Sequence, residues 1–218
     1  MHSVDEIEII NNTFSEMSIS SGVLYGGSTT SWYQQMGYGK SNLIYTDCHF
    51  IDNTNSHTES PYNQGGALQY GNTLSISNTC LTFRNCEFIR NKCINGKGGA
   101  LSISVSQDVS IVDCLFEENV AQQGGGAIYI WGKASKVNNE QPEVPTDLSL
   151  NLVSIVNCRF TENKGNKGSC ILVEEDNIKI ISVNISLCTF TNKLAFISGS
   201  KLALLTLKYC IQSKYLMA

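Results

Sequence analysis

Nine cysteines are the first residues in this sequence that are capable of chemistry, and most of them recur in one local context. Thiols can bind a metal ion, form disulfides or pack as small apolar side chains. Structural zinc sites need ligands that converge from several directions, commonly as C-x-x-C pairs, and this sequence has C-x-F instead. We therefore predict no metal ion and no cofactor. The C-x-F cysteines are Cys48, Cys86, Cys114, Cys158 and Cys188, and Cys210 closes a degenerate copy.

Two interpretations of the C-x-F cysteines remain. If the copies stack, their side chains form one column, and neighbouring Cα atoms lie within the range that a disulfide allows. Side chains in register point in parallel, however, which fits the disulfide torsion poorly. We expect a buried ladder of thiols, because free cysteine is among the most buried residue types, and keep disulfides as the alternative. Cys93 and Cys170 are expected to fill small-residue positions.

Carboxylates are the second group of residues that could do chemistry. If the copies stack as a β-helix, an enzyme has to be considered, since many β-helix proteins are polysaccharide lyases or hydrolases. Asp47 and Asp113 occupy equivalent positions two copies apart. Stacking predicts a separation of roughly 10 Å, near the upper limit for an inverting acid–base pair. Neither residue lies beside an evident cluster of Lys or Arg, so solvated or turn-bonded carboxylates are the simpler interpretation. The three histidines form no recognisable triad, and we predict no catalytic residue.

Phenylalanine and asparagine complete the repeated motif C-x-F-x-x-N. We predict that the phenylalanines build the core. Asparagines stacked at a corner can hydrogen-bond to one another and to turn backbone that would otherwise be buried without a partner, so we predict a structural role for them as well. These residues are Phe50, Phe88, Phe116, Phe160, Phe190, Asn53, Asn91, Asn119 and Asn163.

The residues around the motifs predict β-strands. Apolar residues stand three and five places before each of seven anchors and alternate with mostly polar neighbours, which is the period of a strand with one buried face. A second alternating run follows each glycine pair, where glycine supplies a positive φ or a close backbone approach. The clear pairs are Gly65 and Gly66, Gly98 and Gly99, and Gly125 and Gly126.

Such a unit cannot bury its own apolar face, whereas stacked units can. The predicted fold is therefore all-β, a single-stranded parallel β-helix of about seven rungs that forms one array over residues 1–218. Its best-formed rungs span 43–192, with decayed rungs at 5–25 and 194–212. Insertions near 26–41, 56–63 and 133–147 are expected to be surface loops. A β-sandwich would not explain why identical motifs fall in columns.

Composition excludes several classes of protein. A hydrophobic content of 42% with 16% charged residues can support a core, so the chain is not disordered. The net charge is −4 and the 15 basic residues are scattered, which argues against a nucleic-acid partner. We find no targeting segment at the start, and the apolar run 202–207 is too short for a transmembrane segment.

The C-x-F-x-x-N and G-G-A-[IL] motifs resemble the repeats of chlamydial polymorphic outer membrane proteins, whose marks are F-x-x-N and G-G-A-I. The resemblance covers roughly residues 43–192. It implies a right-handed parallel β-helix of the pectin lyase-like kind, located at a cell surface or extracellular and used for adhesion. Host or cell-surface proteins or glycans are the partners that it implies.

Function is expected where the copies differ. The insertion near 26–41 contains Trp32, Tyr33 and Tyr38, which can stack on sugar rings, dock a partner protein or fold back to cap the solenoid. Our leading hypothesis is a non-enzymatic adhesive β-helix. The alternatives are a carbohydrate-active enzyme on the same scaffold and a purely structural repeat segment. Neither end looks like a strong cap, so we also expect a longer natural chain or end-to-end self-association.

Overall fold

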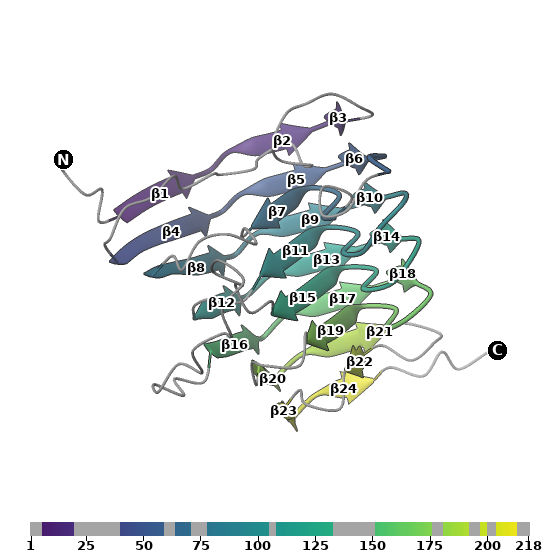
Figure 1. Ribbon diagram of the computed structural model, residues 1–218. Helices are drawn as coiled ribbons and strands as arrows, with labels where there is room; N and C mark the ends of the chain where they lie inside the picture. The colour runs from purple at the N-terminus through teal and green to yellow at the C-terminus, as the bar shows by residue number, and fades with distance from the viewer. Residues whose placement is uncertain are drawn as a thin grey trace, which may run out of the picture.

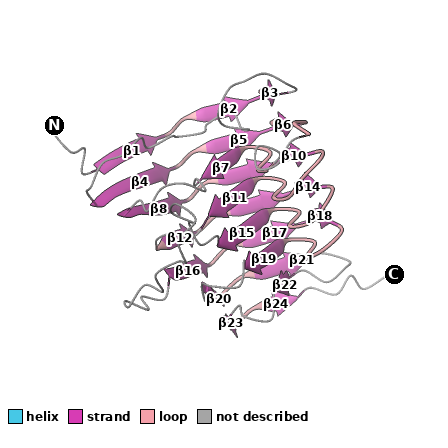
Figure 2. Cartoon of the chain, in the orientation of Figure 1, coloured by secondary structure: helices cyan, strands magenta, loops and turns pink. Residues whose placement is uncertain are grey.

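The computed structural model describes residues 6–19, 40–58, 64–70, 78–104, 108–132, 151–175, 181–191, 197–199 and 204–212. Every element in these ranges is a β-strand, and every strand pairing is parallel. Successive coils of the chain lie one above another, with the first and last described strands at opposite ends of the stack (Figures 1 and 2). The predicted all-β parallel β-helix is confirmed.

Two long sheets run the length of the stack, and each contains seven strands. The first sheet contains the strand that precedes each C-x-F anchor, in the order β1 (Glu6–Ile10), β4 (Lys40–Thr46), β8 (Asn78–Arg84), β12 (Val109–Val112), β16 (Asn151–Val156), β20 (Ile181–Ser186) and β23 (Leu204–Lys208). The second sheet contains the strand that includes the anchor phenylalanine, in the order β2 (Thr13–Ser15), β5 (His49–Ile51), β9 (Glu87–Ile89), β13 (Leu115–Glu117), β17 (Arg159–Thr161), β21 (Thr189–Thr191) and β24 (Ile211–Gln212).

Two shorter sheets of five strands each complete the coil. The third sheet contains two-residue strands, namely β3 (Ser18–Ile19), β6 (Thr54–Asn55), β10 (Lys92–Cys93), β14 (Val120–Ala121) and β18 (Lys164–Gly165). The fourth sheet follows the glycine corners and contains β7 (Leu68–Tyr70), β11 (Leu101–Ser104), β15 (Ile128–Gly132), β19 (Ile171–Glu175) and β22 (Ile197–Gly199).

The strand register reproduces the columns that the motifs predict. Leu81 pairs with Val109, which pairs with Val153, and the neighbouring column continues in the same way through Ile111 and Ile155. These side chains point into the coil and are at most 3% exposed. Register in a parallel sheet is set by which face is apolar, because a shift by one residue would turn every apolar side chain outward.

Two features of the fold were not predicted. The second and third sheets consist of strands of two or three residues, which are too short to show a hydrophobic period in sequence. Strand β4 begins at Lys40, so the insertion predicted near 26–41 extends no further than residue 39. The insertion at 133–147 and most of those near 26–41 and 56–63 lie outside the described residues.

Candidate functional site

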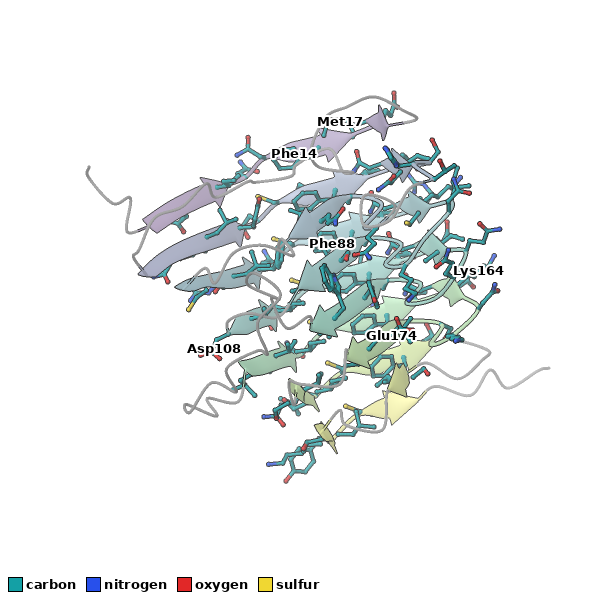
Figure 3. The ribbon with its side chains drawn as sticks, viewed as in Figure 1. Phe14, Met17, Phe88, Asp108, Lys164 and Glu174 are labelled. Carbon is teal, nitrogen blue, oxygen red and sulfur yellow. The ribbon has the colours of Figure 1, made fainter. Side chains whose placement is uncertain are left out.

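The phenylalanine column forms the centre of the coil. Phe50, Phe88, Phe116, Phe160 and Phe190 are fully buried. Their rings stack face to face with centroids 4.7 to 4.9 Å apart and interplanar angles of 3 to 9°. Phe14 extends the stack at the N-terminal end, on the same line as Phe88 (Figure 3). This spacing is the distance between neighbouring strands, so stacking and strand pairing reinforce each other.

The asparagine column is a continuous ladder of buried amides. The Asn119 Nδ2 donates to the backbone oxygen of Phe88 at 2.8 Å and to Asn163 Oδ1 at 3.0 Å. Its Oδ1 accepts from the backbone N–H of Asn91 at 2.9 Å and from Asn91 Nδ2 at 3.0 Å. The same pattern joins Asn53 to Asn91. The amides of Asn53, Asn91 and Asn119 each satisfy corner backbone of the preceding rung and donate to the asparagine amide of the following rung, which leaves them no capacity to bind a ligand.

The C-x-F cysteines form a thiol ladder at the corner between the first and second sheets, and all the described cysteines are free. The Sγ atoms of Cys48, Cys86, Cys158 and Cys188 each lie between backbone carbonyls of two rungs, and Cys114 Sγ lies 3.2 Å from the backbone oxygen of Val112. Cys48 Sγ is 3.3 Å from the backbone oxygens of both Thr46 and Ile9. Cys93 and Cys170 occupy other interior positions, where burial raises the pKa of each thiol to about 12.

These thiols should be inert in the folded protein, because they are at most 3% exposed and a reagent in solution cannot reach their Sγ atoms. We expect Ellman's reagent to label Cys80 and Cys210, which are partly exposed, well before the other cysteines. The remaining thiols should react only as the chain unfolds, so their labelling rate should follow the unfolding rate as denaturant is raised. Rapid labelling of all nine in the native protein would contradict this arrangement. The slow group is Cys48, Cys86, Cys93, Cys114, Cys158, Cys170 and Cys188.

The two glycines of each pair have different structural roles. Gly98 has a φ of +75°, in the left-handed region that favours glycine. Gly99 is required for a different reason, because a Cβ placed on it would lie 1.9 Å from the backbone oxygen of Gly126 in the next rung. Gly65 and Gly66 repeat both roles, as do Gly125 and Gly126. The pair therefore sets how closely successive rungs can approach at this corner.

The carboxylates considered for catalysis stand at left-handed corners. Asp47 and Asp113 have φ values of +54° and +56°, and Asn85 lies between them in the column with a φ of +50°. Asn85 Nδ2 donates to Asp47 Oδ1 at 2.6 Å, and Asn157 Nδ2 donates to Asp113 Oδ1 at 2.6 Å. Asp and Asn tolerate this backbone conformation better than other residues with side chains, which accounts for their repetition before the anchor.

A second left-handed corner follows the phenylalanine, where equivalent positions hold Asp52, Arg90, Glu118 and Glu162 with φ values of +52 to +56°. Arg90 donates to both carboxylate oxygens of Asp52, at 2.8 and 2.7 Å, and this bidentate hydrogen bonding holds the pKa of Asp52 below its usual range. At the start of β5, His49 Nδ1 lies 3.0 Å from Glu87 Oε2. Both contacts join residues of neighbouring rungs. No group of three or more potential metal ligands occurs among the described residues.

One cluster on the outside of the fourth sheet was missed in the sequence. Tyr129, Trp131 and Leu172 point away from the core and yet are at most 7% exposed. Glu174 accepts a hydrogen bond from the Tyr129 hydroxyl at 3.0 Å and pairs with Lys97, whose Nζ lies 5.0 Å from the centroid of the Tyr129 ring. Glu174 marks this face in Figure 3. Consecutive large residues at 129–131 were its signal in the sequence.

A hydrogen-bond chain extends the same cluster along the fourth sheet. Trp131 Nε1 donates to Ser102 Oγ at 3.2 Å, and Ser102 Oγ donates to Gln64 Oε1 at 3.0 Å. Glu174, Lys97 and the hydrogen-bonded side chains are thus polar partners of one another across several rungs. We call this cluster the external clamp and interpret it as a set of contacts that holds neighbouring rungs together on the outside of the fourth sheet.

The predicted interaction residues Trp32, Tyr33 and Tyr38 lie outside the described residues. Among the segments that the structure does describe, none forms an apolar helix of membrane-spanning length.

Comparison with known proteins identifies one repeat. Residues 113–130 match the family model described as the Chlamydia polymorphic membrane protein repeat. The matched stretch begins at the corner residue Asp113 and ends at Ile130 in β15, so it contains one complete anchor motif and one glycine pair. The chain thus carries a repeat of the polymorphic membrane protein type, as its motifs predicted. No curated protein and no solved structure matches the chain.

Proposed function

We propose that this chain is a non-enzymatic β-helix at a cell surface or in the extracellular space, and that it holds variable insertions at fixed positions for adhesion to a protein or a glycan. One observation carries the proposal. The residues that repeat from copy to copy are engaged in building the stack, as the four hydrogen bonds of Asn119 illustrate. Residues available for a partner are therefore those that differ between copies, above all in the insertions.

Two further observations support the proposal. The repeat at 113–130 is of a type that defines a membrane-protein family, which favours a surface location. The carboxylates of Asp47 and Asp113 are each hydrogen-bonded to an asparagine of the next rung, and Asp52 is paired with Arg90. Carboxylates held in this way lack the separate environments that divide an acid from a base in a glycosidase, which favours adhesion over hydrolysis.

Adhesion is tested by substitution in the insertion near 26–41. We expect the purified chain to bind cultured cells or members of a glycan array, and the triple change of Trp32, Tyr33 and Tyr38 to alanine to reduce that binding at least tenfold, because aromatic side chains supply much of the contact energy at such surfaces. Binding is measured by flow cytometry and by array fluorescence.

A matched control replaces residues 135–145, in the insertion at 133–147, with a short Gly-Ser linker. The unfolding midpoint of each variant should equal that of the unmodified chain, which separates lost contact from lost fold. Binding that survives the triple change would place the adhesive surface elsewhere. A well-folded chain that binds neither cells nor glycans would support a purely structural repeat segment instead.

A further inference from the structure

The first and last parts of the sequence carry opposite formal charge. Residues 1–39 contain Asp5, Glu6, Glu8 and Glu16 and no Lys or Arg, which gives a formal charge of −4. Residues 177–218 contain five lysines and no Asp, Glu or Arg, which gives +5. The net charge of the whole chain, −4, hides this polarity. The lysines are Lys179, Lys193, Lys201, Lys208 and Lys214.

The described strands at the two ends are also sheet edges. β1 and β23 occupy the opposite edges of the first sheet, and β2 and β24 those of the second, at the top and bottom of the stack in Figure 1. The outer N–H and C=O groups of an edge strand can pair with a further strand. Apolar side chains accompany these edges, since Ile10 is 52% exposed at one end and Leu207 and Ile211 are 47% and 64% exposed at the other.

We propose that copies of this chain stack head to tail, with β23 of one copy pairing in parallel with β1 of the next. This goes beyond the proposed function and does not depend on it. The observed register continues directly across such a junction. By register, Leu205 lies in the column of Ile7 and Leu207 in that of Ile9, so the junction continues both columns and covers Leu207.

The same register brings the opposite charges together. Lys208 lies in the column of Ile10, so it faces Ile10 of the next copy, and Glu8 lies on the same outward face two residues earlier. Glu8 already makes a polar contact on the side of β1 that pairs with β4. Thr46 pairs with Ile10, and its Oγ1 lies 3.5 Å from Glu8 Oε1. The longer side chain of Lys208 can therefore reach the Glu8 carboxylate from the other side.

A head-to-tail junction leaves one acidic and one basic end free after each addition. Such heterologous contacts generate open chains unless the rotation between copies closes a ring. We therefore expect rods of increasing length, with a mass that rises with protein concentration and falls as salt screens the charges. The basic end also offers an alternative occupant, an anionic membrane surface, which the experiment distinguishes.

Sedimentation velocity of the full chain tests the proposal, with Glu8→Lys and Lys208→Glu as separate variants. The unmodified chain should associate at low salt and dissociate in about 1 M salt, where the screening length is about 3 Å. Each variant alone should associate about tenfold more weakly, because it presents the same charge at both ends of a junction. An equimolar mixture of the two variants should recover association, since each acidic end again meets a basic end.

Charge-matched controls lie in the middle of the stack, where Glu118→Lys and Lys92→Glu change exposed residues, and Lys92 lies on β10 at the centre of the third sheet. They should associate as the unmodified chain does. A monomer at every concentration in low salt would overturn the proposal, as would two variants that fail to recover association when mixed. Binding of the monomer to phosphatidylserine vesicles, lost in Lys208→Glu, would overturn it in favour of a membrane contact at the basic end.

Discussion

Replacing Asn119 with alanine should lower the free energy of unfolding by about 3–5 kcal/mol, because it leaves several buried polar groups without partners. The Asn91 backbone N–H and amide lose their acceptor, and the backbone oxygen of Phe88 loses its donor. Asn119 is fully buried, so water cannot replace the missing bonds without opening the corner. Urea denaturation followed by circular dichroism measures the effect.

Two companion variants sharpen this result. Asn184→Ala changes an exposed asparagine on the outer face of β20 and should cost less than about 0.5 kcal/mol. Asn119→Asp should depend on pH. Burial beside acceptor oxygens raises the pKa of the new carboxyl in the folded protein above its value in the unfolded chain, which is about 3.9. The protonated carboxyl fits the buried site, so the Asn119→Asp protein is most stable below that pH. Its stability is lost as pH rises through the folded pKa. Equal stability of Asn119→Ala and the unmodified chain would contradict the amide ladder.

Replacing Gly99 with alanine should cost about 4 kcal/mol or more, which is enough to prevent folding of a marginally stable array. The added Cβ would lie 1.9 Å from the backbone oxygen of Gly126 and 2.6 Å from the backbone nitrogen of Val120. Both atoms belong to main chain in the neighbouring rung, and rotation of a side chain cannot relieve the overlap. The rungs must separate, which weakens the pairing between β11 and β15. Thermal unfolding and soluble yield report the loss.

Gly165→Ala is the matched control. Gly165 pairs with Ala121, which pairs with Cys93, so its column already accommodates a Cβ. A Cβ on Gly165 would lie 2.8 Å from the backbone nitrogen of Gly126, so the main chain must shift here too, but by less than the 1.9 Å contact at Gly99 requires. We expect a cost of about 1–3 kcal/mol, below that of Gly99→Ala. A Gly99→Ala protein as stable as Gly165→Ala would show that this corner does not limit the distance between rungs.

The columns of the coil were predictable because a stacked repeat imposes the same environment on equivalent residues. Phe88, Phe116 and Phe160 recur at one motif position, and the structure stacks them at strand spacing. Asp47 and Asn85 recur before the anchor, and the structure places both in a left-handed corner that suits them. Repetition converts a local preference into a long-range contact, because the neighbour of each residue is its own counterpart in the next copy.

The external clamp was not predictable in the same way. Lys97, Tyr129 and Glu174 stand at different motif positions in three different copies, so no repetition connects them. Their contact arises because Tyr129 in β15 lies beside Leu172 in β19 and Lys97 extends over the Tyr129 ring from the preceding corner. The two-residue strands of the third sheet escaped prediction as well, since a period of two needs more residues than β10 or β14 contains.

The sequence by itself determined the parallel stack, its interior columns and its glycine corners, because each rests on apolar periodicity and on repeated turn residues. Tertiary structure alone decided how the polar groups were used. It showed that the Asn119 amide bonds to rungs on both sides, that the Cys48 thiol lies between two carbonyls, and that Gly99 is needed for contact with the next rung rather than for its own φ. Hydrogen-bond partners and close approaches depend on distances between rungs, and a one-dimensional pattern contains no distances.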